Sequence, residues 1–144
     1  MKIIEHFIDG KKYSGNSKRF STVYNPATGE ETAKVKLGSL EDLNKAVQNA
    51  QEAFLNWSNT PPLQRARVMF KFKDLIEKNE DELTKIIVSE HGKVYEDAKG
   101  SLTRGLEVVE YACGIPQMLK GEFTENVGKN VDSWSLRQPL GVCA

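Results

Sequence analysis

Between residues 39 and 113 the hydrophobic positions recur every three or four residues, and elsewhere they alternate with polar residues or form short runs. The first pattern predicts amphipathic helices and the second predicts strands. Four helices are predicted, beginning near Ser39, Thr60, Asn79 and Val94. We expect their apolar positions to be buried: Leu43, Ala46, Val47, Ala50, Ala53, Phe54 and Trp57; Leu63, Ala66, Met69, Phe70 and Ile76; Leu83, Ile86 and Ile87; Ala98, Leu102, Gly105, Leu106, Val109 and Cys113.

Local signals mark the ends of these helices. Ser39 is suited to cap the first helix and Thr60-Pro61 the second, because a hydroxyl accepts from free amides and proline needs no amide partner. Asn79 followed by Glu82 resembles a capping box for the third helix, which Gly92 is expected to end. Small residues in the fourth helix, among them Gly105, permit close approach of another backbone.

Three segments outside the helices are predicted to be extended. Asp9-Gly10 favours a two-residue turn, so the residues on either side form a hairpin. Residues 21–37 are extended apart from a turn at 25–29, and residues 121–138 form a second hairpin around Gly128-Lys129-Asn130. The uncharged run 139–144 begins like a buried strand.

The fold class predicted for this chain is α+β, with four helices, an amino-terminal hairpin and strands, and a carboxyl-terminal β-arm. Helices followed by strands indicate helices that cover a sheet supplied elsewhere. Because chain ends are normally exposed, the apolar run 139–144 leads us to expect a piece of a longer protein.

Composition narrows the partners and the compartment. The 144 residues carry twenty Lys and Arg and twenty Asp and Glu, a net charge of zero, so no one-signed field attracts nucleic acid. The apolar runs are too short to cross a membrane. Two cysteines are too few for a disulfide framework, and the amino end lacks the pattern of a signal peptide, so we expect a cytoplasmic protein.

Few side chains indicate chemistry. No Gly-x-Gly pattern is present, which leaves neither a dinucleotide turn nor a phosphate loop. His6 and His91 lie in no metal-ligand spacing and are expected to be structural or solvated, and no metal site is predicted. Cys113 and Cys143 lie in apolar segments, where burial raises the pKa of a thiol, and core packing is expected for both.

Arg104 is the side chain with the clearest functional interpretation. A guanidinium aimed inward from a largely apolar helix requires an anion, either a ligand or an internal carboxylate. Glu107 and Glu110 are expected to be solvated or paired with a base rather than catalytic. Phe123 and Trp134 are better explained as a subunit contact or a cover for a core than as a platform for stacking bases.

Several segments carry a resemblance to a known family. Residues 25–30 (NPATGE), 90–93 (EHGK) and 97–100 (DAKG) resemble amino-terminal signatures of the aldehyde dehydrogenase superfamily. Residues 104–116 and 137–144 resemble its CoA-acylating branch, which acts on methylmalonate and malonate semialdehydes. The resemblance covers the entire chain.

The resemblance implies a parent enzyme of α/β fold that uses NAD, with coenzyme A as co-substrate, in valine or inositol catabolism. A cysteine thiolate would attack the aldehyde, hydride would pass to NAD, and CoA would accept an acetyl or propionyl group after loss of carbon dioxide. The catalytic cysteine, the oxyanion asparagine and the cofactor-binding glycine turn would all follow Ala144. No catalytic, cofactor-binding or metal residue is therefore expected in this chain, and Arg104 alone is carried over, as the residue that binds the substrate carboxylate.

The resemblance also implies how the chain is divided. Residues 1–120 would be the helical part of the NAD-binding domain, residues 121–138 strands of the bridging sheet, and residues 139–144 the start of the first central strand. A homotetramer assembled through the arm is expected, with no nucleic acid or membrane as partner. Two alternatives remain: a non-catalytic helical interaction module with a β-arm, and an aldehyde dehydrogenase of different substrate.

Overall fold

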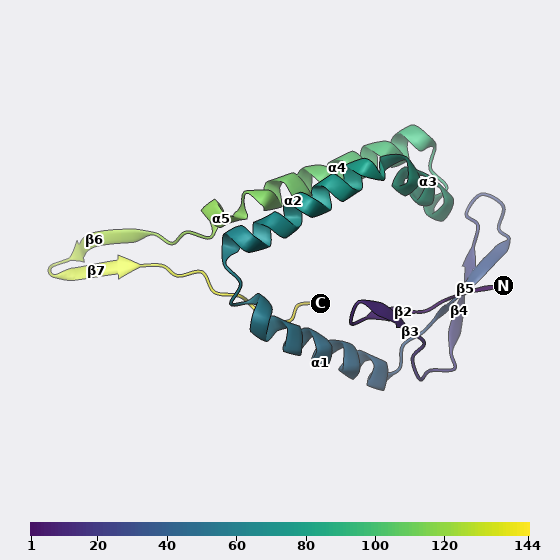
Figure 1. The fold of residues 1–144 in the computed structure, drawn as a ribbon, viewed down its shortest axis with the longest axis horizontal. Helices are drawn as coiled ribbons and strands as arrows, with labels where there is room; N and C mark the ends of the chain where they lie inside the picture. Colours follow the sequence, from purple (N-terminus) through teal and green to yellow (C-terminus); the bar gives the residue numbers. More distant parts are fainter.

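The computed structural model describes residues 1–144 and contains five helices and seven strands (Figure 1). In chain order these are β1 (Lys2–Ile4), β2 (His6–Ile8), β3 (Lys11–Tyr13), β4 (Phe20–Tyr24), β5 (Glu31–Lys36), α1 (Leu40–Trp57), α2 (Pro62–Lys78), α3 (Glu80–His91), α4 (Tyr95–Cys113), α5 (Ile115–Met118), β6 (Phe123–Gly128) and β7 (Val131–Trp134). The α+β class is confirmed. A fifth helix, α5, was not predicted; it begins directly after α4, and Pro116 lies in its first turn, where proline needs no amide partner.

The amino-terminal strands form two small sheets. β2 and β3 pair as an antiparallel hairpin, and Asp9 and Gly10 at its turn both have positive φ, of 57° and 69°, which confirms the predicted turn. β5 lies between β1, which is parallel to it, and β4, which is antiparallel. The turn between β4 and β5 is held by Asn25, whose side-chain oxygen accepts from the amide of Ala27.

The helices begin close to the predicted positions, but of the three predicted side-chain caps one is confirmed and two are wrong. Ser39 caps α1 in a full capping box with Asp42. α2 begins at Pro62 with no side-chain cap, because the Thr60 hydroxyl donates to the carbonyl of Asn56 in the preceding turn. Asn79 makes no cap for α3 either, because its side-chain amide donates to a carbonyl at the end of α2.

Helices α2, α3 and α4 pack together, and α1 runs apart from them (Figure 1). The buried positions between these helices are small: Ala66 on α2, Thr84 on α3, and Ala98 and Val109 on α4. Small side chains allow helix axes to approach closely, so the contact is tight but encloses little volume. Nothing approaches Gly105, where an added Cβ would meet no atom within 4 Å, so the close approach that this glycine permits does not occur within this chain.

The chain is open and encloses almost no core. Its accessible surface is 11337 Å², whereas a compact protein of this mass would expose about 7,500 Å². Only six residues are buried, which contradicts the burial expected for many apolar positions. The helical stripes are present but face solvent at Leu43, Val47, Trp57, Leu63, Phe70 and Ile86, because the chain supplies no layer to cover them.

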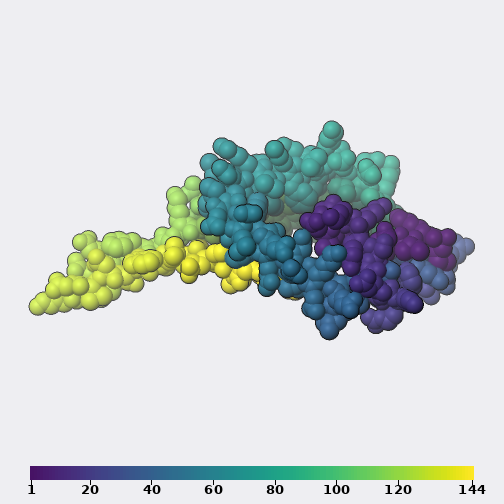
Figure 2. Space-filling view, turned by 60° about the horizontal axis from the view of Figure 1, so that its bottom comes forward, coloured from purple at the N-terminus to yellow at the C-terminus, as the bar shows by residue number.

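Residues 121–134 extend away from the helices. β6 and β7 form a hairpin that stands off the body as an arm, visible in both views (Figures 1 and 2). The strands end at Trp134, short of the predicted residue 138. Residues 139–144 form no strand, and Leu140 is 94% exposed, because no neighbouring strand is present to complete the hydrogen bonds of a buried one. No helix combines the length and the apolar character that a membrane span requires.

Candidate functional site

Arg104 lies on α4 with its side chain folded back toward the start of that helix. Its Nη2 donates to the Ser101 hydroxyl oxygen at 3.3 Å, and its Nη1 lies 3.6 Å from the place of a Cβ on Gly100. Lys93, just before α4, donates to the same hydroxyl oxygen from Nζ at 2.6 Å. The hydroxyl itself donates to the carbonyl of Asp97 at 3.1 Å. One serine oxygen therefore accepts from two cations.

This cationic pair has no acidic partner in the chain. The ion pairs present involve Lys11, Lys73, Lys85 and Lys99, and none reaches Lys93 or Arg104. The internal carboxylate considered for Arg104 is therefore not found. The expectation that Arg104 points inward is wrong in this chain, since the residue is exposed and nothing covers α4 on that side.

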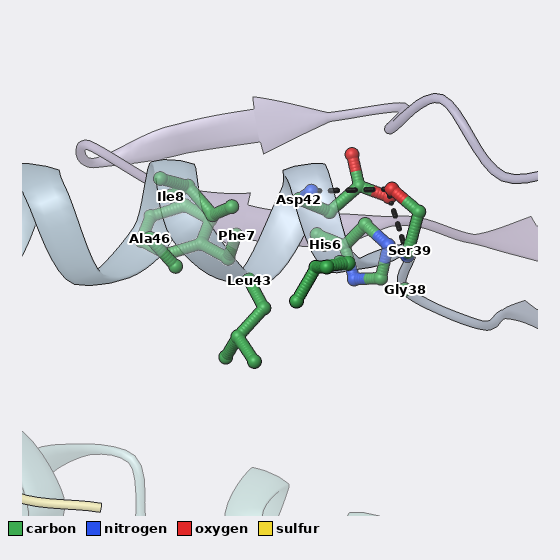
Figure 3. A pocket seen from close by; sticks show the side chains of 9 residues that line it. His6, Phe7, Ile8, Gly38, Ser39, Asp42, Leu43 and Ala46 are labelled. Atoms are coloured by element: carbon green, nitrogen blue, oxygen red, sulfur yellow. Dashed lines mark hydrogen bonds between the residues drawn. The ribbon is translucent and has the colours of Figure 1, made fainter.

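A second feature is a cavity of about 520 Å³ between β2 and the first turns of α1 (Figure 3). Phe7, Ile8 and Leu43 supply an apolar lining, and His6 lies at the end nearest the α1 cap. The Nε2 atom of His6 is buried and has no hydrogen-bond partner. The cavity is largely apolar and open, and His6 is its only imidazole.

Asp42 also lines that cavity, and its carboxylate accepts four hydrogen bonds. Its carboxylate accepts from the amide and hydroxyl of Ser39 at 2.8 and 2.9 Å, from the amide of Asn16 at 3.0 Å and from the hydroxyl of Tyr13 at 3.1 Å. These hydrogen bonds, those from Ser39 first, hold the pKa of Asp42 well below its usual range. Because Ser39 is bonded to this carboxylate and not to His6, the cavity contains no activated nucleophile.

The other residues considered for chemistry are scattered. Cys113 is half-buried on α4, whereas Cys143 is exposed, so the predicted core role is wrong for Cys143, which lies in no strand. His91 is exposed in the last turn of α3. Glu110 forms an ion pair with Lys73 at 3.5 Å, and Glu107 is exposed.

Lys73 is held between two carboxylates. Its Nζ is 2.5 Å from Glu77 on the same helix and 3.5 Å from Glu110 on α4, and these contacts, with Glu77 first, raise the pKa of Lys73. Of the two roles considered for Glu110, a solvated carboxylate or the partner of a base, the structure shows the pairing. No group of three or more His, Cys, Asp and Glu side chains lies together as a metal site requires.

The two aromatic residues of the arm face solvent. Phe123 and Trp134 lie opposite each other in the register of β6 and β7. Phe123 is 67% exposed and Trp134 is 70% exposed. Neither residue covers a core within the chain. Of the two interpretations that the sequence favoured, a subunit contact therefore remains.

Sequence reasoning had missed Lys93 and Ser101. Ser101 and Arg104 are three residues apart on one helix, a spacing that places their side chains on the same face, so this contact was open to prediction. The position of Lys93 could not be predicted in this way, because it depends on Gly92. That glycine adopts a left-handed conformation with φ of 79° and redirects the chain between α3 and α4.

Comparison with known proteins gives a consistent result. The model of the aldehyde dehydrogenase family matches residues 13–144. A malonate-semialdehyde dehydrogenase of Pseudomonas aeruginosa is 49% identical over all 144 residues, which make up 29% of that protein. A mitochondrial acylating methylmalonate-semialdehyde dehydrogenase of Arabidopsis thaliana is 46% identical over 98% of this chain and 23% of its own length.

Solved structures of similar proteins agree with these relatives. A structure from Sinorhizobium meliloti, described as a methylmalonate-semialdehyde dehydrogenase complexed with NAD, superposes with a TM-score of 0.91 at 48% identity and covers 98% of this chain. The methylmalonate-semialdehyde dehydrogenase of Oceanimonas doudoroffii gives 0.90 at 50% identity over 97%. The chain spans 29% and 28% of those two chains.

Proposed function

This chain belongs to the aldehyde dehydrogenase family, and we propose that the protein containing it is an NAD-dependent, CoA-acylating dehydrogenase of malonate and methylmalonate semialdehydes. In the proposed reaction, malonate semialdehyde, CoA and NAD⁺ give acetyl-CoA, carbon dioxide and NADH. The methylmalonate compound gives propionyl-CoA in the same way. The chain corresponds to about three tenths of such an enzyme.

One observation supports the substrate class most directly. Both semialdehydes carry a carboxylate, and Arg104 offers a guanidinium that no acidic side chain of the chain pairs with. The planar fork of arginine binds a carboxylate through two parallel hydrogen bonds. We therefore propose that Arg104 binds the substrate carboxylate, while other parts of the protein supply the chemistry at the aldehyde carbon.

The residues of this chain do not fit an NAD site of their own. The one turn that leads from a strand into a helix, between β5 and α1, carries a single glycine, Gly38. At the start of α1 the amide of Asp42 donates to the Ser39 hydroxyl, and the amide of Ser39 donates to the Asp42 carboxylate, so these two amides are already bonded within the capping box and are not free for a phosphate. The groups that bind NAD and CoA are accordingly proposed to lie outside these 144 residues, together with the nucleophile.

The first test is an assay of the complete protein. We expect NADH to form from malonate semialdehyde only when both NAD and CoA are present, and the 144-residue chain alone to form none. Replacement of Arg104→Leu should raise KM for the carboxylated substrate about tenfold to a hundredfold, the value of a hydrogen bond to a charged group. KM for propanal should stay within about twofold. Equal changes for both aldehydes, or turnover by the isolated chain, would contradict the proposal.

Two further properties are proposed with it. The exposed apolar side chains of β6 and β7, Phe123, Val127, Val131 and Trp134, support assembly of a homo-oligomer through the arm. The two unbonded cysteines support a cytoplasmic location. The competing possibility is an aldehyde dehydrogenase of different substrate, and the comparison with propanal distinguishes the two.

A further inference from the structure

We propose that the carboxylate site extends beyond Arg104: Lys93 is a second cation that contacts the substrate carboxylate, and Ser101 is a positioning residue that holds both cations. This inference rests on the proposed function, because it assigns two more residues to the same site. It arises from the geometry around a single hydroxyl oxygen, which accepts from Lys93 at 2.6 Å and from Arg104 at 3.3 Å.

The closeness of the two cations requires an explanation. Their nitrogens can lie no farther apart than the sum of those two distances, and like charges this close repel each other. Three lysines of these helices are paired with carboxylates, Lys73 with Glu77, Lys85 with Asp81 and Lys99 with Glu80. An anion bound between Lys93 and Arg104 would remove the repulsion and gain charge-assisted hydrogen bonds from both.

Ser101 is suited to fix the two cations relative to each other. A hydroxyl has one hydrogen to donate and two lone pairs to accept with. Here the hydrogen is directed to the carbonyl of Asp97, and the two lone pairs face Lys93 and Arg104. All three positions are used, so the oxygen cannot rotate away without losing a bond. The cations are thus held in place before any ligand arrives, which lowers the entropic cost of binding.

The backbone brings Lys93 to this point. Gly92 ends α3 in a left-handed conformation, and the chain then turns into α4, so that Lys93 lies beside the second turn of that helix. Arg104 folds back toward the same turn, over Gly100, where no Cβ projects. The site is therefore built from the α3–α4 connection and one face of α4.

The test uses the complete enzyme with paired variants. Ser101→Ala removes the shared acceptor, and Lys93→Gln removes the second cation at similar length. Thr103→Ala is the matched control for the hydroxyl, because Thr103 also donates to the carbonyl four residues earlier but contacts no cation. Lys99→Gln is the control for the charge, since Lys99 is paired with Glu80. Ser101→Thr retains a hydroxyl and should restore wild-type behaviour.

The expected result is a split between substrates. Ser101→Ala and Lys93→Gln should each raise KM for malonate semialdehyde about tenfold, with KM for propanal, NAD and CoA within about twofold and both controls close to wild type. An equal rise for propanal would assign these residues a structural role and overturn the inference. A rise confined to NAD or CoA would assign the anion to a phosphate and would also overturn it.

Failure of the proposed function is distinguishable from failure of this inference. If the wild-type protein oxidises neither aldehyde, the function fails, and the site is then tested by titrating the protein with malonate and following the binding by calorimetry. Binding that is lost in Ser101→Ala and Lys93→Gln but kept in Thr103→Ala would support the carboxylate site on its own. No malonate binding by an otherwise folded wild-type protein would overturn it.

Discussion

Among single residues, Asp42 does the most to join the amino-terminal segment to the helices. Its carboxylate receives donors from the α1 cap and from residues 13 and 16, which are remote in sequence. Space beside it is limited, because a Cβ on Gly15 would lie 3.0 Å from Asp42 Oδ2. The Gly15 φ of 66° is also one that glycine adopts without strain. Asp42 and Gly15 thus help to hold residues 13–16 against the start of α1, while β1 is attached separately through its pairing with β5.

This arrangement predicts a dependence of stability on pH. The hydrogen bonds from Ser39, Asn16 and Tyr13 lower the pKa of folded Asp42 below its ordinary value of 3.8. A lowered pKa stabilises the folded state fully above 3.8, and this contribution is lost as the pH falls further. Asp42→Asn should lower the melting temperature at neutral pH and flatten the acid fall.

The measurement is thermal unfolding by circular dichroism between neutral pH and the acid range, with amide exchange of Asn16 as a local probe. Asp74→Asn is the control, because Asp74 forms no ion pair or side-chain hydrogen bond. Identical acid profiles for Asp42→Asn and the wild type would exclude the proposed role of this carboxylate.

At the scale of elements, the connection between α3 and α4 positions the candidate site. Gly92 ends α3 with a φ of 79°, and its amide donates to Val88. It also lies against the turn between β4 and β5, since a Cβ on Gly92 would approach Pro26 Cγ to 3.1 Å. The same glycine therefore ends a helix, packs on the β4–β5 turn and directs Lys93 toward Ser101.

Two glycine substitutions should act in opposite directions. Gly92→Ala should cost about 1–2 kcal/mol, because a left-handed conformation is unfavourable for a residue with a Cβ; the contact with Pro26 adds to this. Gly105→Ala, in the middle of α4 with no atom near, should stabilise the helix by about 0.5–1 kcal/mol.

Denaturant unfolding of both variants measures these differences. Gly92→Ala should also raise KM for the carboxylated semialdehyde, because Lys93 would be displaced, whereas Gly105→Ala should leave it unchanged. A stable Gly92→Ala protein with wild-type kinetics would contradict this account of the connection.

At the scale of the whole molecule, the chain exposes several apolar surfaces that nothing within it covers. Its accessible surface exceeds that of a compact protein of the same mass by about half. The apolar face of α1, the outer face of α2 and the arm all carry exposed large side chains, such as Leu43, Phe70 and Trp134. Patches of this kind indicate contact with other polypeptide.

The arm predicts self-association of the chain. We expect the 144-residue chain in solution to show a mass above its 16.2 kDa by light scattering, because the edges of β6 and β7 and their aromatic side chains are unpaired. Replacing Phe123 and Trp134 by serine should reduce the association measurably. A replacement of exposed Lys129 at the turn by alanine is the control and should leave it unchanged. A wild-type chain that stays monomeric would exclude the arm as an assembly surface.

The sequence by itself determined the family and most of the elements, though not α5. Local interactions between near neighbours specify the Asp9-Gly10 turn, the Ser39 cap, the Gly92 end and the helical periodicity, so each was predictable. The wrong cap predictions at Thr60 and Asn79 also have a local cause. Each side chain donates a hydrogen bond to the carbonyl four residues earlier instead of accepting one from a helix amide.

Only the tertiary structure decided which apolar faces are covered and which side chains meet. Burial depends on what lies across from a helix stripe, and periodicity does not contain that information, so Leu43 and Phe70 face solvent while Ala98 is enclosed. The pairing of Lys93 with Arg104 through Ser101 depends on the path of the backbone between two helices. The role of Arg104 as a possible anion ligand could be inferred from its residue type and its place on α4. Lys93 could be identified as its neighbour only from the structure, because contacts across a turn of the chain are set by three-dimensional packing.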